Sequence, residues 1–196
     1  MKNLNLIINE DLEDFNFDIL DCFQRPKCII SDNLVTNSWI LFLLFSEYQT
    51  GFLKENYTNF ILNNTGISLE FNCGEMDTFY NDLEKMMDEN KIIILLTDLY
   101  YDINSPKFFN KIHHIHYSIL EGYNKDEKYF IVIDEIPSVS EYNKIKYSKQ
   151  KKQYNALKNL AIHMGDFKYE NAFIEDNKYF YYSVNRIINI QEIKLL

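Results

Sequence analysis

The sequence predicts an α+β fold, a papain-like arrangement of N-terminal helices packed on an antiparallel sheet. Helical patterns occupy the first part of the chain and the strongest strand patterns follow, whereas a βαβ fold would alternate the two. Residues 115–123 and 129–134 are strand-like runs separated by a short polar turn, the clearest hairpin pattern in the chain. With five Gly, three Pro and no linker-like stretch in 196 residues, we expect one domain covering 1–196.

The remaining elements are predicted from hydrophobic periodicity. The segment 77–91 places its apolar residues on one helical stripe, and it leads directly into 92–97, a β-branched run typical of a central strand. Four further expectations complete the fold: a short strand in 4–10, a mostly buried helix in 33–48, an amphipathic helix over 148–164, and two or three strands within 169–190.

Charge and hydropathy exclude several classes of function. The net charge of −9 and the pI near 4.9 argue against nucleic acid or an anionic membrane as a partner, because such partners require a basic surface. The longest apolar run, Trp39–Phe45, is too short to span a membrane. The first residues lack the basic and apolar regions of a secretion signal, so a cytoplasmic protein is expected.

The hairpin carries a histidine on its first strand and an aspartate at the end of its second. Side chains on neighbouring antiparallel strands reach each other when they share a face and are nearly opposite in register. His116 and Asp134 are 18 residues apart and straddle a turn centred near Lys125, so the register suits a contact. The same alternation places three apolar residues beside the pair: Leu120, Phe130 and Val132.

Two other interpretations of this stretch stand beside catalysis. A polar residue at each end of a hairpin is ordinary, and a single strand histidine is more often a surface residue or a hydrogen-bonded core residue. His114 and His116 share a face and suggest a metal site, but no third ligand is placed by spacing, so we predict neither a metal nor a cofactor. His113 points to the opposite face and cannot join the same site.

The three cysteines are candidate nucleophiles, because a thiolate needs a base, and the base needs a third group to orient it. Their spacing matches no zinc motif, and a reducing compartment would keep them as thiols. Cys22 and Cys28 precede the predicted buried helix, where helix-terminal N–H groups lower a thiol pKa. Cys73 also precedes a predicted helix. A buried, inert thiol is the commoner fate of any one of them.

These residues together resemble a known family. Asp-Cys-Phe at 21–23, the stretch His116-Tyr-Ser-Ile-Leu-Glu-Gly-Tyr-Asn124 and Phe-Ile-Val-Ile-Asp at 130–134 resemble the papain-like cysteine fold in its small bacterial form. That form includes the peptidases that process double-glycine leader peptides and the butirosin-type acyltransferases (the BtrH N-terminal group). The match is close over about 22 residues of the hairpin and holds only in outline elsewhere.

The resemblance implies a role for each matching residue. Cys22 would be the nucleophile, His116 the general base and acid, and Asp134 the group that orients the imidazole. Cys28 remains the alternative nucleophile, because the residues after Cys22 interrupt the long helix that the family has there. Asn16 stands where the family has an oxyanion-hole glutamine.

The resemblance also implies a reaction. A butirosin-type acyltransferase moves an acyl group from a carrier-protein thioester to a small amine and forms an amide, so the expected partners are an acyl or peptidyl carrier protein and an amine. A peptidase or amide hydrolase is the runner-up, and a catalytically inactive carrier- or peptide-binding module is the alternative from another class. Five lysines either form a basic patch that docks an acidic carrier or line a solvated helix face: Lys144, Lys146, Lys149, Lys151 and Lys152.

Overall fold

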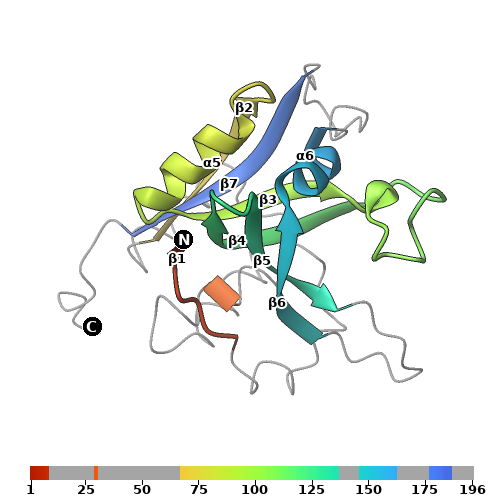
Figure 1. Ribbon diagram of the computed structural model, residues 1–196, viewed down its shortest axis with the longest axis horizontal. Helices are drawn as coiled ribbons and strands as arrows, with labels where there is room; N and C mark the ends of the chain where they lie inside the picture. The colour runs from red at the N-terminus through yellow and green to blue at the C-terminus, as the bar shows by residue number, and fades with distance from the viewer. Residues whose placement is uncertain (9–28, 31–66, 137–145, 163–176, 187–196) are drawn as a thin grey trace, which may run out of the picture.

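The computed structural model describes five parts of the chain: residues 1–8, 29–30, 67–136, 146–162 and 177–186. They form an α+β structure in which helices pack on one antiparallel sheet (Figure 1). The elements are β1 (Lys2–Asn3), β2 (Ile67–Glu75), α5 (Phe79–Asp88), β3 (Ile92–Asp98), the 3₁₀ turn η3 (Leu99–Tyr101), β4 (Ile115–Asn124), β5 (Tyr129–Ile136), β6 (Lys146–Gln153), α6 (Tyr154–Ile162) and β7 (Lys178–Arg186).

The strand order of the sheet is β2-β7-β3-β4-β5-β6, and β1 pairs with the end of β4, beyond the part of β4 that pairs with β3. Every described pairing is antiparallel. The predicted central strand is confirmed, because β3 lies between β7 and β4 and all seven of its residues are buried. Burial on both faces explains why its sequence, IIILLTD, is almost continuously apolar and β-branched.

The predicted hairpin is also confirmed, as β4 and β5 joined by a turn at 125–128. Its register shifts between Leu120 and Gly122, so one strand carries an extra residue there. β1 packs closely on this point, since Asn3 pairs with Gly122. A Cβ atom on Gly122 would lie 2.5 Å from the carbonyl oxygen of Lys2, so only glycine fits.

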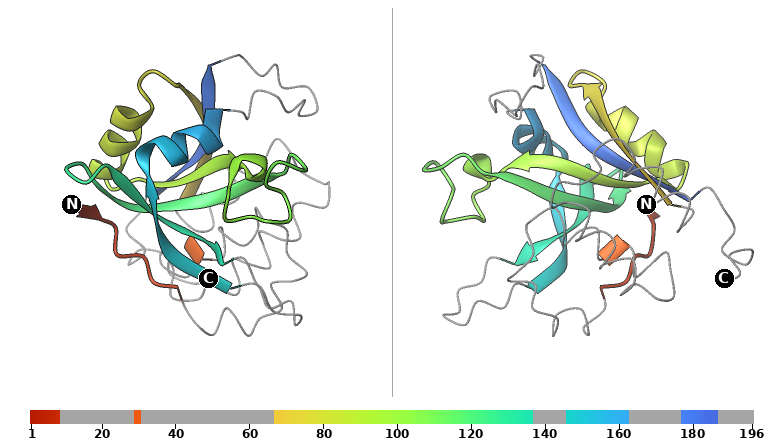
Figure 2. Two further views of the ribbon diagram at one scale, coloured as in Figure 1. Left: turned by 45° about the vertical axis from the view of Figure 1, so that its right-hand side comes forward. Right: turned by 180° about the vertical axis from the view of Figure 1, so that it is seen from behind.

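Both described helices cover one face of the sheet (Figures 1 and 2). The stripe predicted for 77–91 is confirmed in α5, where Phe79, Leu83 and Met87 are buried. Together the helices and alternate strand positions enclose one core, which also contains Ile93, Leu95, Leu120, Phe130, Val132, Tyr154, Leu157, Ala161 and Tyr179. The aromatic rings pack edge-to-face or stacked inside it, as Phe79 does against Tyr179 at 4.8 Å between centroids.

The other face of the sheet is buried as well. Ile94, Ile119 and Ile133 point away from the helices, and none of the three is exposed to solvent. The pair Ile29 and Ile30, helical and buried, lies on this side of the sheet (Figures 1 and 2). This pair follows Cys28 directly in the sequence, whereas Cys28 itself lies outside the described residues.

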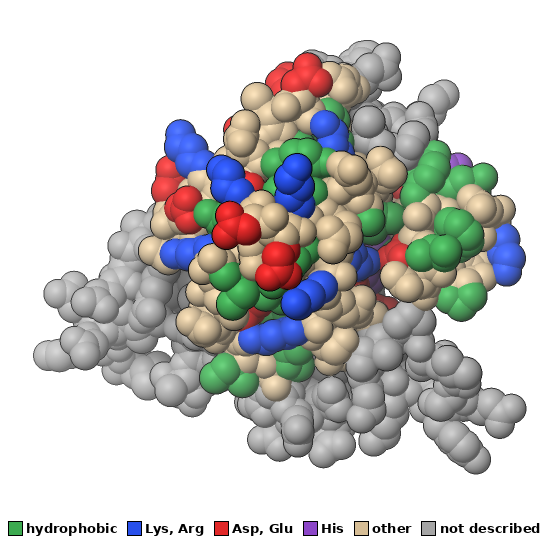
Figure 3. All heavy atoms as spheres, viewed as in Figure 1, with side chains coloured by type: hydrophobic (Ala, Val, Ile, Leu, Met, Phe, Trp, Pro, Cys, Tyr) green, Lys and Arg blue, Asp and Glu red, His purple; other side chains and the backbone are tan. Residues whose placement is uncertain are grey.

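A loop projects from the sheet between β3 and β4. Figure 3 shows charged side chains of both signs spread over the visible face, with hydrophobic side chains gathered on this lobe, where Ile103 and Ile112 are exposed. Asp98 closes the base of the loop: its buried carboxylate accepts hydrogen bonds from the backbone N–H groups of Tyr100 and His114. The loop therefore leaves and re-enters the sheet at a fixed point.

Several sequence predictions are wrong or incomplete. The helix predicted over 148–164 begins at Tyr154, because residues 146–153 instead pair with β5 along its whole length. The strand predicted in 4–10 is found at Lys2–Asn3 instead. One strand, β7, is described within 169–190, and β2 was not predicted at all. The helix predicted in 33–48 lies outside the described residues, and the described helices lie among the strands rather than before them.

Candidate functional site

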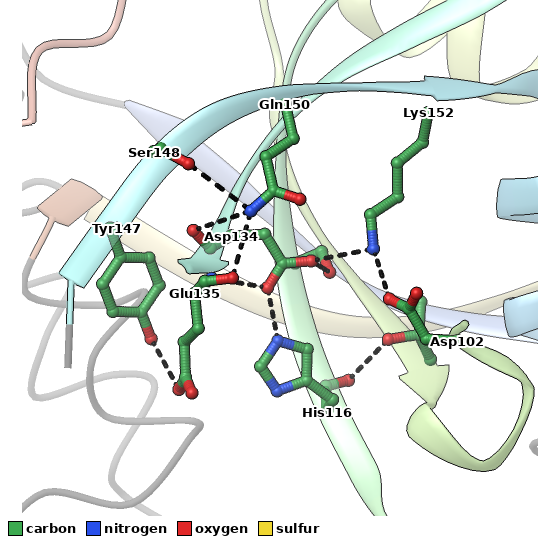
Figure 4. A network of polar contacts seen from close by, with 10 residues as sticks. Asp102, His116, Asp134, Glu135, Tyr147, Ser148, Gln150 and Lys152 are labelled. Atoms are coloured by element: carbon green, nitrogen blue, oxygen red, sulfur yellow. Dashed lines mark hydrogen bonds and ion pairs between the residues drawn. The ribbon is translucent and has the colours of Figure 1, made fainter. Parts of the chain in front are cut away.

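The candidate site lies where two neighbouring strands stop pairing. β4 and β5 pair as far as Ile119 and Ile133. Beyond that point β4 continues along β3 to Ile115, while β5 continues along β6 to Ile136. The space between the separated strands is occupied by polar side chains from β4, β5, β6 and the loop after β3 (Figure 4).

The centre of the site is the predicted pair of His116 and Asp134. His116 Nε2 lies 2.5 Å from Asp134 Oδ1, and the two side chains are 4% and 6% exposed. Continuing the register makes Ser118 the residue opposite Asp134, so His116 reaches Asp134 along the diagonal. The prediction that spacing across the turn brings the two residues together is thus confirmed, as is the apolar floor of Leu120, Phe130 and Val132.

The Asp134 carboxylate has no unused oxygen. Oδ1 accepts from His116 and from the backbone N–H of Glu135 at 2.8 Å. Oδ2 accepts from the Ser118 hydroxyl at 2.8 Å and lies 3.3 Å from Lys152 Nζ. Because these partners are donors, the carboxylate is held both as an anion and in one orientation.

The charges of the site shift the pKa values of its members. Burial alone would raise the pKa of the Asp134 carboxyl, but His116, Lys152 and the Ser118 hydroxyl together lower it well below its usual range. Burial would lower the pKa of His116, but Asp134 and then Glu135 raise it above its usual value, while Lys152 acts in the opposite direction. Asp134 is therefore ionised at neutral pH and accepts a hydrogen bond from the Nε2–H group of the imidazole.

The second ring nitrogen of His116, Nδ1, has no hydrogen-bond partner among the residues that the structure describes. With the proton on Nε2, the neutral imidazole carries its lone pair on Nδ1, and Nδ1 hydrogen-bonds to none of the described residues. Figure 4 shows this nitrogen on the side of the ring away from Asp134. A buried imidazole with an oriented ring and a free lone pair is equipped to accept a proton from a third group.

Lys152 and Asp102 belong to the site and were not predicted there. Lys152 Nζ lies 2.7 Å from Asp102 Oδ2, so it bridges two carboxylates, and its side chain is 8% exposed. Asp102 comes from the projecting loop, where its Oδ1 accepts from the N–H of Asn104. No sequence spacing relates these residues to His116, and the helix predicted across Lys152 hid the alternation that turns it towards Asp134.

The candidate nucleophiles are not all placed. Cys22, Cys28 and Asn16 lie outside the described residues. Cys73 is exposed on β2, which is separated from β4 by β7 and β3. Strands spaced about 4.8 Å apart put β2 about 14 Å from β4, so Cys73 is not brought to His116.

The neighbouring histidines have different surroundings. His113 Nδ1 lies 2.6 Å from Asp98 Oδ2, and its ring stacks on Tyr100 at 4.2 Å. The ring of His114 stacks on Phe108, and burial, followed by the charges of His116 and Lys107, lowers its pKa. Among the described residues no group of three or more His, Cys, Asp or Glu is arranged to hold a metal ion.

Of the five lysines considered for a carrier-docking patch, the structure describes the side chains of Lys149, Lys151 and Lys152. Lys152 is buried in the site, so its inclusion was wrong. Lys149 pairs with the buried Glu121 at 2.6 Å, and Lys151 lies over the ring of Tyr129. The side chains of Lys144 and Lys146 are outside the described residues.

The comparisons with known proteins leave the family open. No protein-family model matches the chain, and no curated protein matches its sequence. None of the described helices has the length and apolar character needed to cross a membrane.

Proposed function

We propose that the protein is a cysteine-dependent acyltransferase of papain-like fold, which takes an acyl group from a carrier-protein thioester and passes it to an amine. The observation that carries the proposal is the buried pair of His116 and Asp134, with Nε2 bound to the carboxylate and Nδ1 free of any described partner. The α+β architecture and the hairpin motif support the same conclusion, because both agree with what the sequence resemblance implies.

The proposed reaction has two stages. Cys22, or Cys28 in its place, gives its proton to His116 Nδ1, and the thiolate attacks the thioester carbonyl. The carrier thiol leaves with that proton, and the acyl group remains on the cysteine. An amine then attacks the acyl-enzyme, His116 accepts the amine proton and returns it to the leaving cysteine, and an amide is formed. Asp134 keeps the imidazole ring oriented throughout.

The decisive experiment measures iodoacetamide alkylation of the wild type against pH, with each cysteine followed by peptide mass spectrometry. One cysteine is expected to alkylate with an apparent pKa well below the free-thiol value of about 8.5. His116→Ala should abolish that advantage. His113→Ala is the control, since His113 also pairs with an aspartate, Asp98, but through Nδ1 and outside the site.

Three outcomes separate the alternatives. Enhanced alkylation at Cys22 or Cys28 that depends on His116 supports the enzyme and identifies its nucleophile. Slow alkylation of all three cysteines, unaffected by His116→Ala, contradicts catalysis and favours a carrier- or peptide-binding module. If a cysteine is activated, incubation with an acyl N-acetylcysteamine thioester and a primary amine separates the reactions: amide product supports transfer, and free acid alone favours the hydrolase.

A further inference from the structure

One buried cation, the ammonium of Lys152, links Asp134 on β5 to Asp102 in the loop after β3. Lys152 comes from β6, is 8% exposed, and places its ammonium 3.3 Å from Asp134 Oδ2 and 2.7 Å from Asp102 Oδ2. A buried lysine without partners would lose its charge, and here both partners are carboxylates that are themselves buried. Burial would lower the pKa of Lys152, but Asp134 and Asp102 raise it above its usual value, so the ammonium stays charged.

The ammonium gives the two oxygens of the Asp134 carboxylate different partners. Lys152 and Ser118 occupy Oδ2, which leaves Oδ1 directed at His116 Nε2 (Figure 4). A carboxylate free to rotate would offer either oxygen to the imidazole at varying angles. With both oxygens assigned, the ring has one favourable orientation.

The ammonium also balances charge. The groups that face His116 are Asp134 and Glu135 from β5, Lys152 from β6 and His114 ahead of β4, while Thr97 on β3 is uncharged and meets the backbone of His116. Two carboxylates therefore favour the protonated imidazole, and Lys152 is the cation among these groups that opposes them. A base held too firmly in its protonated form accepts no further proton.

We propose that Lys152 is a positioning residue of the His116 and Asp134 site: its ammonium fixes the orientation of the carboxylate and offsets part of the negative charge that would hold the proton on the imidazole. Asp102 sets the strength of this effect, because it shares the same ammonium. The inference rests on the proposed function only in taking His116 as the base, and it adds two residues that the Cys-His-Asp pattern does not contain.

The test is an NMR titration of the His116 ring in the full-length protein and in four variants. Lys152→Met keeps the apolar stem and removes the charge, so the His116 pKa should rise by about one unit. Asp102→Asn removes the competing carboxylate, so the His116 pKa should fall. Lys152→Arg retains the cation and should restore the wild-type titration. Lys151→Met is the matched control, because that lysine lies on the same strand with an exposed side chain, over the ring of Tyr129 and outside the site.

The experiment is decisive because the proposal and a purely structural role predict opposite shifts of the His116 pKa in Lys152→Met. A lysine that only supported packing would, when removed, loosen the pair and let the His116 pKa fall towards its usual value of 6.5. A fall or no change in Lys152→Met therefore overturns the proposal. If Lys152→Met does not fold, Asp102→Asn and Lys152→Arg decide: a His116 pKa unchanged in Asp102→Asn, or shifted in Lys152→Arg, overturns it as well.

Failure of one proposal can be distinguished from failure of the other. The titration is measured on the imidazole and needs no nucleophile, whereas the acyltransferase proposal is tested by cysteine alkylation. If the cysteine is reactive, the amine stage supplies a second measurement: with the His116 pKa about one unit higher, amide formation at a pH well below the wild-type pKa should slow about tenfold in Lys152→Met. Lys151→Met should leave that rate unchanged.

Discussion

His116 bonds to Asp134 across a diagonal of the sheet, at 2.5 Å, although Ser118 is the residue that the register places opposite that aspartate. The diagonal exists because β4 and β5 separate after Ile119 and Ile133. Ser118 contributes its hydroxyl to the same carboxylate, so the side chains replace the backbone bonds that the strands no longer make.

The first prediction concerns the orientation of the imidazole. Asp134→Asn removes the negative charge that raises the pKa of His116, so the NMR titration of this ring should shift to lower pH. The loss of a fixed acceptor should also let the ring populate both neutral tautomers, which ¹⁵N chemical shifts report. Asp98→Asn is the matched control: it alters the contact with His113 and should leave the His116 titration unchanged.

The second prediction is a window of pH for the stability that the pair provides. The folded pKa of His116 is raised, so its contribution is complete below 6.5 and is lost as pH rises through the folded pKa. The folded pKa of Asp134 is lowered, so its contribution is complete above 3.8 and is lost as pH falls through the folded pKa. The coupling energy should therefore be greatest between pH 3.8 and 6.5.

Urea denaturation of a double-mutant cycle measures this coupling. The cycle comprises His116→Gln, Asp134→Asn and the double variant, and a charge-assisted hydrogen bond predicts a coupling of about 1.5–3 kcal/mol within the window. A coupling energy that stays constant from pH 3 to pH 9 would contradict the assigned ionisation states.

The third prediction concerns Gly122. A Cβ atom there would lie 2.5 Å from the Lys2 carbonyl oxygen, which is backbone and cannot rotate away. Gly122→Ala should therefore lower the free energy of unfolding by about 1–3 kcal/mol and detach β1, with loss of amide protection at Leu4, whose N–H donates to the Glu121 carbonyl. In a chain lacking residues 1–3, Gly122→Ala should lower the free energy of unfolding much less than it does in the full chain. If it does not, the close approach of β1 is not the cause.

The fourth prediction concerns the buried carboxylate at the bulge. Glu121 is fully buried, accepts from the N–H of Leu6 at 3.1 Å and pairs with Lys149. Lys149→Met leaves this charge without its cation and should cost about 3–5 kcal/mol in urea denaturation. Replacing both residues by Met should recover much of that cost. A single variant as stable as the wild type would mean that solvent compensates the charge.

The fold was partly predictable because some elements carry local signals. The hairpin and β3 combine β-branched runs with a polar turn, and α5 places three buried residues on one stripe. β6 was mistaken for helix because the sequence KYSKQKKQ has little intrinsic preference for a strand, and pairing with β5 overrides its propensity. β2 was missed for a similar reason, since its partner β7 is more than 100 residues away in the sequence.

The site was also predictable only in part. His116 and Asp134 are joined by a short turn, so sequence spacing alone limits their separation. Lys152 and Asp102 meet only through the arrangement of β6 and the projecting loop, and no local pattern relates residues 50 positions apart. The extra residue near Glu121 was equally hidden, because a bulge moves register without changing composition.

The separation of β4 and β5 also affects how stiff the sheet is. Past Ile119 and Ile133 no backbone ladder between the described residues joins the two strand pairs. The crossing contacts there come from side chains: His116 and Ser118 to Asp134, and Lys152 to Asp102. Backbone bonds keep their strength at any pH near neutrality, whereas bonds to a titrating imidazole and carboxylate do not. At this end of the sheet, the stiffness of the connection between the two strand pairs therefore depends on the protonation of His116 and Asp134, while the β4–β5 ladder joins the pairs at the other end.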